Sequence, residues 1–210
     1  MLKYKNQKHH LLTLQNTFNM KTLFITILTI FLLNTKAQSQ ITFLGLDFNK
    51  AKFVGSEGFL DADKIQSVYL NTWNDVMITE AEKFNLSKLY KKEFSNNFDY
   101  VKNLNKQVDV KSAITNNEYT LSEEDAKQYI TSSYQNSGTG KGVLYLVESF
   151  NKTTDQGNIF VVLLDMNSGK VQYIKKFSAT AKGFGFRNFW LSTVYGVMKI
   201  SSKEIKHENW

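Results

Sequence analysis

The chain contains a single arginine, and it stands in a stretch whose residue types could bind an anion. Arg187 belongs to the segment GFGFRNFW, where two glycines precede it and aromatic residues flank it. Gly183 and Gly185 would let backbone amides approach a ligand, and a guanidinium holds a carboxylate or phosphate through two parallel hydrogen bonds. In the structural interpretation, which we favour, the glycines make a tight turn and Arg187 pairs with one of the chain's own carboxylates.

Three carboxylates are the other residues that could do chemistry. Asp47, Glu148 and Asp165 each lie in or at the end of an apolar segment typical of a buried strand. Two facing carboxylates can hydrolyse a glycosidic bond, so an exported hydrolase acting on an envelope or glycan polymer is the alternative function. We favour structural roles, in which Asp47 and Asp165 accept backbone hydrogen bonds at strand ends and Glu148 faces solvent or pairs with a lysine on a neighbouring strand. Any of the three could be the partner of Arg187.

The residues that most enzymes use for proton transfer or metal binding are nearly missing. There is no cysteine, and the only histidine after residue 37 is His207. This composition therefore nearly excludes three kinds of site: a Ser-His-Asp triad, a cysteine nucleophile and a Cys/His zinc site. No calcium-loop spacing is present either. We accordingly expect no metal and no cofactor, and whether the chain is an enzyme stays undecided, with the balance against it.

The amino-terminal region predicts export. Met20 and Lys21 precede the uncharged apolar run Leu23–Leu33, and small residues follow at Thr35 and Ala37. A basic start, a short apolar core and a small-residue cleavage site are typical of a secretory signal peptide. The run of eleven residues is too short for a membrane span, which needs roughly 20. The sequence thus predicts an upstream extension over 1–19, a signal peptide over 20–37 and one domain over 38–210.

The charge balance changes once the first 37 residues are set aside. The whole chain carries 26 basic and 19 acidic residues, a net charge of +7. Five of those lysines and no acid lie in residues 1–37, which leaves 21 basic and 19 acidic residues and a net charge of +2. No basic stripe with interleaved aromatic residues remains, so nucleic acid is not an expected partner.

Apolar periodicity predicts the elements that must position these residues. Continuous or alternating apolar runs indicate strands over 41–48, 143–150, 159–166 and 171–177. Helical spacing extends over 61–84, 97–108, 120–134, where Thr120 and Glu123 suggest a capping box, and from 186 onward. We expect an α+β fold: a mainly antiparallel four-stranded sheet, made of one amino-terminal strand plus a three-stranded meander, packed with about four helices.

The carboxy-terminal part of the chain resembles a group of uncharacterised secreted proteins of Gram-negative bacteria. Their pattern is a strand ending in Asp, a turn with Gly-Lys, another strand, and then GFG-x-R-x-x-W before a helix. The matching residues here are Asp165, Gly169, Lys170, Gly183, Gly185, Arg187 and Trp190. The stretch GLDFNKAKFVG near the start of the domain is similar to theirs as well. The resemblance implies an exported domain of unknown function and assigns no catalytic residue.

These observations favour a periplasmic or otherwise exported cell-envelope protein that binds or assembles rather than catalyses. The expected partner is another envelope protein or a small anionic ligand, with Arg187, Gly183 and Gly185 as the candidate ligand-binding residues. After signal cleavage no membrane span is expected. The hydrolase acting through Asp47, Glu148 or Asp165 stays the alternative.

Overall fold

A computed structural model describes residues 40–205 of the chain. These residues belong to one compact unit, Ser39–Trp210, and the buried core described below is built within it. We therefore expect residues 39–210 to fold by themselves. The predicted upstream extension, the predicted signal peptide and His207 lie outside the described residues.

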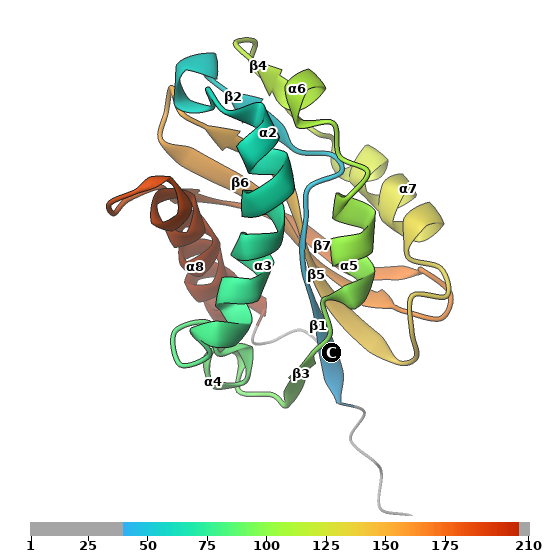
Figure 1. Ribbon diagram of the computed structural model, residues 1–210. Coiled ribbons are helices and arrows are strands. Elements are labelled where there is room, and N and C mark those ends of the chain that lie inside the picture. The colour runs from blue at the N-terminus through green and yellow to red at the C-terminus, as the bar shows by residue number, and fades with distance from the viewer. Residues whose placement is uncertain (1–39, 206–210) are drawn as a thin grey trace, which may run out of the picture. The chain divides into compact units, whose positions relative to one another are not determined.

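The described residues form a seven-stranded sheet with helices packed around it (Figure 1). The strands are β1 (Ile41–Asp47), β2 (Lys52–Val54), β3 (Phe94–Asn96), β4 (Ile114–Thr115), β5 (Lys141–Asn151), β6 (Gln156–Asp165) and β7 (Val171–Thr180). The helices are η1 (Ser56–Gly58), α2 (Ala62–Lys64), η2 (Ile65–Tyr69), α3 (Leu70–Thr79), α4 (Leu86–Tyr90), α5 (Asp99–Asn105), α6 (Val110–Ala113), α7 (Glu123–Ser133) and α8 (Phe186–Glu204).

The prediction of a mainly antiparallel four-stranded sheet is wrong. β1 pairs in parallel with β3 and β5, and β2 pairs in parallel with β4 and β5. Only the β5–β6 and β6–β7 pairings are antiparallel. The sheet is mostly parallel and strongly curled, in an α/β-type arrangement. The three strands that the sequence did not predict are two or three residues long, too short for a period of two to be visible, and parallel pairing depends on helical crossovers between distant segments.

The predicted helices also differ from the structure in their bounds. The region 61–84 is helical over α2, η2 and α3, with a π-helical segment in the middle, and the regular helix stops at Thr79. The cap of α7 is Ser122 rather than Thr120, since the Ser122 Oγ accepts the Asp125 N–H at 3.0 Å. α4 and α6 are short helices that the expected set of about four did not include.

Neighbouring lysines on β7 show that helices cover both faces of the sheet. Lys175 bonds to Glu204 of α8, whereas Lys176 bonds to Glu148 of β5. Because successive side chains of a strand point to opposite faces, α8 and Glu148 lie on opposite sides of the sheet. Glu148 also accepts the N–H of Leu121, just before α7, and α7 lies against β7, so α7 covers the face opposite α8. On the α8 face the Trp190 ring stacks on Phe150 with centroids 4.9 Å apart.

Two buried asparagines bond to the end of β1 where a neighbouring strand is missing. β3 pairs only with residues 41–43 of β1. Beyond it, the Leu46 N–H donates to Asn74 Oδ1 at 2.7 Å, and the Leu46 carbonyl accepts from Asn74 Nδ2 at 3.1 Å and Asn105 Nδ2 at 2.8 Å. The Phe48 N–H donates to Asn105 Oδ1 at 2.9 Å. The side chains thus complete the hydrogen bonding of a buried backbone segment.

We expect Asn105→Ala to lower the free energy of unfolding by about 2–4 kcal/mol, because it leaves the buried Phe48 N–H without its acceptor and removes a donor from the Leu46 carbonyl. Urea unfolding of the 39–210 chain measures the change. The matched control is Asn103→Ala, an exposed asparagine of the same helix. Equal effects of the two substitutions would show that helix propensity, and not the contact with β1, is responsible.

Candidate functional site

The Asp47 carboxylate is buried, and its hydrogen-bonding capacity is used within the protein. Its Oδ2 accepts the hydroxyls of Tyr129 at 2.7 Å and Tyr134 at 2.8 Å, both from the α7 region. Its Oδ1 accepts the Asn49 backbone N–H and side-chain amide, each at 2.8 Å. Burial first, and then the adjacent carboxylate, raises the pKa of both phenols, so they stay protonated donors. Asp47 joins β1 to α7.

Glu148 is also buried, at 2% exposure, and it bonds to a lysine. Its Oε1 accepts the Leu121 N–H at 2.9 Å and Lys176 Nζ at 2.8 Å. Lys176 lies on β7, which is separated from β5 by β6, so the pair crosses β6 instead of joining adjacent strands as expected. The Lys176 ammonium lies over the Phe160 ring of β6, 5.5 Å from the ring centroid. One Glu148 contact is to the segment just before α7, so Glu148 helps to hold that helix on the sheet.

Asp165 closes the turn after β6, away from the other two carboxylates. Its Oδ1 accepts the backbone N–H and the hydroxyl of Ser168, both at 2.8 Å. On β5, Asp165 is opposite Lys141 whereas Asp47 is opposite Leu146. Five residues of strand separate these positions, roughly 17 Å. The structure therefore brings Asp165 to neither of the other two, and none of the three lines the grooves described below.

The glycine pair and Arg187 lie at the start of α8. Gly183 and Gly185 have φ values of +106° and +82°, in the region that L side chains rarely adopt. The Arg187 carbonyl accepts the Trp73 indole N–H at 3.1 Å, and its Nε donates to Asn188 Oδ1 at 3.0 Å. The carboxylate that Arg187 meets is none of the three expected ones.

That partner is Glu80, at the carboxy-terminal end of α3. Arg187 Nη2 lies 4.0 Å from Glu80 Oε1, and Lys83 Nζ lies 3.6 Å from Glu80 Oε2. The Arg187 side chain keeps 43% of its surface exposed. Glu80 therefore holds two cations at the surface without covering either of them.

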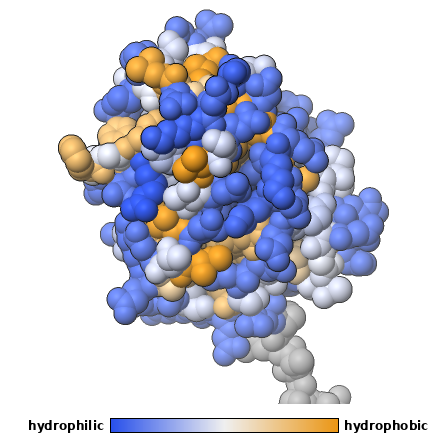
Figure 2. Space-filling model, in the orientation of Figure 1, coloured by the Kyte–Doolittle hydropathy of each residue, from blue (hydrophilic) through white to orange (hydrophobic). Residues whose placement is uncertain are grey.

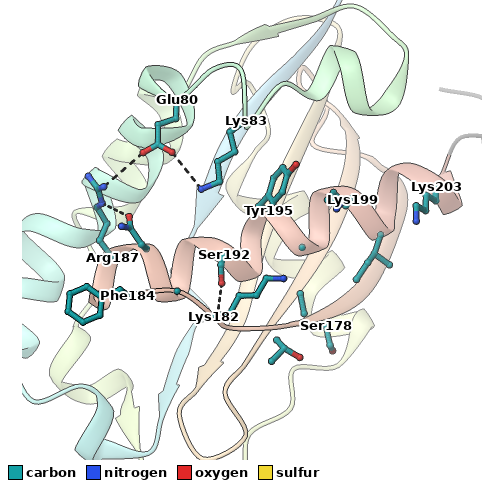
Figure 3. Close-up of a pocket in the computed structure, with 16 residues that line it drawn as sticks. Glu80, Lys83, Ser178, Lys182, Phe184, Arg187, Ser192, Tyr195, Lys199 and Lys203 are labelled. Carbon is teal, nitrogen blue, oxygen red and sulfur yellow. Dashed lines mark hydrogen bonds and ion pairs between the residues drawn. The ribbon is translucent and has the colours of Figure 1, made fainter.

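Arg187 and Gly183 line an open groove along α8, which we call the α8 groove (Figure 3). Its volume is about 980 Å³, and its walls are α8, the end of β7, the turn before α8 and the segment after α3. Its charged residues are Glu80, Lys83, Lys182, Arg187, Lys199 and Lys203. Five cations thus face one carboxylate. Gly185 shapes the turn but is not part of the wall.

A second hollow of about 390 Å³ continues the basic surface toward α4. It shares Lys83, Tyr195, Lys199 and Lys203 with the α8 groove and adds Lys88 and Lys91, with Glu82 as its one acid. The two hollows lie on either side of these shared residues, so positive charge extends along the exposed face of α8.

Two of the three predicted ligand-binding candidates, Arg187 and Gly183, line this groove, whereas its lysines were not among the candidates. Lys199 and Lys203 are four residues apart on the polar face of a helix, a spacing that places both on one side and could have been noticed. Lys83 belongs to a different segment, and only the packing of α3 beside α8 brings it to the groove.

The contacts of Asp165 predict that the stability of the domain depends on pH through the ionisation of this carboxylate. The Ser168 backbone and hydroxyl lower the pKa of Asp165 below its ordinary 3.8. A lowered folded-state pKa contributes stability that is present at neutral pH and is lost as the pH falls through the folded value. We expect Asp165→Asn to be less stable than the parent at pH 7. At about pH 2 the two proteins should be equally stable, because the Asp165 carboxyl is then protonated.

Urea unfolding at a series of pH values measures this difference. In a Ser168→Ala background the gap between Asp and Asn should narrow, because one of the two donors is gone. A gap that stayed constant down to the acid limit would contradict a role through the ionised carboxylate.

No group of three or more His, Cys, Asp or Glu side chains within residues 40–205 is placed to hold a metal ion. Over the same residues, every helix is too short or too polar to cross a bilayer. No family model and no curated protein matches the chain. Among solved structures, the lipoprotein GNA1162 from Neisseria meningitidis is similar with 10% sequence identity and a TM-score of 0.31, over 82% of this chain and 99% of that chain. A similarity this distant carries no argument for a shared function.

Proposed function

We propose that this protein is an exported cell-envelope domain that binds an anionic ligand in the α8 groove and is not an enzyme. The observation that carries the proposal is the concentration of positive charge in that groove. Its six charged residues have a net charge of +4, and the other 16 basic and 18 acidic residues after position 37 have a net charge of −2. The positive charge is therefore local and not a property of the whole domain.

Three of the five groove cations are available to a ligand. Lys182, Lys199 and Lys203 form no ion pair with the carboxylates described in residues 40–205. The Lys182 backbone N–H donates to Ser192 Oγ at 2.8 Å, which ties the turn to the helix. A single exposed ion pair is worth less than about 1 kcal/mol, so a ligand with several negative charges suits this groove better than a lone carboxylate.

Export is proposed from the sequence. The short apolar run Leu23–Leu33 after Lys21 and the small residues that follow it are typical of a cleaved signal peptide. The GFG-x-R-x-x-W resemblance to secreted proteins of Gram-negative bacteria supports the same location. The hydrolase alternative gains no support, because Asp47 and Glu148 are buried and bonded and Asp165 closes a turn.

The test is titration of the 39–210 chain with inorganic tripolyphosphate by calorimetry at low and at moderate salt. We expect Lys199→Gln/Lys203→Gln to weaken binding about ten-fold, since two contacts to a multivalent anion are lost, and we expect salt to weaken parent binding. The control, Lys106→Gln/Lys170→Gln, removes the same charge from two exposed positions outside the groove. Equal weakening by both double variants would mean that tripolyphosphate senses net charge alone, and the groove proposal would fail.

A further inference from the structure

The turn before α8 holds a phenylalanine in solvent. Phe184 stands between Gly183 and Gly185 and is 95% exposed. A Cβ added at Gly185 would meet no atom within 4 Å, and one added at Gly183 would meet only the Asn188 carbonyl oxygen at 4.0 Å. There is therefore room for a side chain at both positions. Glycine is favoured there because the backbone has positive φ values, which few other residues adopt. The glycines shape a turn whose tip is an uncovered aromatic ring.

The ring adjoins the α8 groove and is bordered by its cations. Phe184 lies at one end of the groove, and Lys182 and Arg187, which stand before and after it in the sequence, line the same groove (Figure 3). Figure 2 shows apolar groups protruding at the upper left of the view, over the turn before α8 and the loop before α2; other apolar groups lie lower on this face, among hydrophilic ones. An exposed aromatic tip beside lysine and arginine is typical of a surface that rests on an anionic bilayer.

The neighbouring loop is apolar at its tip but differs in charge. Leu60 is 87% exposed, and the adjacent Phe59 ring lies 6.0 Å from that of Phe186, so the two loops are side by side. Glu57 and Asp61 line the hollow beside Leu60 together with one cation, Lys64, so its net charge is negative. Negative charge there opposes contact with anionic head groups, so the favourable contact is at the Phe184 turn.

From this geometry we infer that the ligand of the α8 groove is the phosphate head group of an anionic lipid in a bilayer, with the Phe184 ring entering the interface beside it. The inference rests on the proposed function and names its ligand. The strength of binding at a membrane interface increases with the apolar area that is buried and with the electrostatic attraction to anionic lipids, so the ring and the cations both contribute. An aromatic ring without nearby cations would suit a pocket of a partner protein better, and here five cations share its groove.

The test is co-sedimentation of the 39–210 chain with vesicles of phosphatidylcholine, with and without about a third phosphatidylglycerol. We expect the parent to bind the anionic vesicles and not the neutral ones, and Phe184→Ser to weaken that binding about ten-fold or more. Phe184→Ser should keep the parent's melting temperature and tripolyphosphate affinity, because the ring packs against nothing. The matched control is Ile78→Ser, a 48% exposed apolar residue of α3 outside the groove, which should bind the vesicles like the parent.

Three results would overturn the inference. Vesicle binding by Phe184→Ser equal to that of the parent would show that the ring does not enter the interface. Failure of the parent to bind anionic vesicles while it binds tripolyphosphate would leave the groove as a site for a soluble anion and would show that Phe184 does not enter a bilayer. Failure of the parent to bind either probe would remove the proposed function together with the inference.

Discussion

The end of β1 is held by two side chains in place of a neighbouring strand, and much of the domain depends on that arrangement. Asn74 and Asn105 bond to the backbone of Leu46 and Phe48 beyond the point where β3 ends. Because the asparagines come from α3 and α5, the same bonds attach both helices to the sheet. Gly45 shows how close the approach is: a Cβ there would lie 2.4 Å from Asn74 Oδ1. The backbone of Leu46 and Phe48 is therefore hydrogen-bonded although the edge strand β3 ends before it reaches these residues.

The position of α3 also sets the start of α8. Trp73, next to Asn74, packs against Phe48, Phe150 and Phe186, and its indole N–H donates to the Arg187 carbonyl. The first turn of α8 is thus attached to α3 before any ligand contact is considered. The carboxy-terminal end of α3 brings Glu80 and Lys83 to the α8 groove, and Phe184 alone among these aromatic rings stays outside the packing.

The long elements could be predicted from the sequence, and the way they combine could not. The segments of β1, β5, β6, β7 and α8 carry apolar runs long enough for a period to be visible. β2, β3 and β4 contain two or three residues each and change the sheet from antiparallel to mostly parallel. A structural role for Asp47 was anticipated, but its phenol partners, Tyr129 and Tyr134, depend on α7 lying over the end of β1.

The sequence by itself determined the local chemistry: no cysteine, one arginine, a domain of almost balanced charge, and a Gly-Phe-Gly turn whose glycines permit positive φ. These properties depend on residue type and near neighbours. The tertiary structure decided which groups meet, because Glu80 and Lys83 reach the groove beside Arg187 only once α3 packs beside α8. It also decided that the three carboxylates are bonded within the fold and that positive charge collects beside an exposed ring. Contacts of this kind form between segments that are far apart in the chain, so they cannot be predicted from a local sequence pattern.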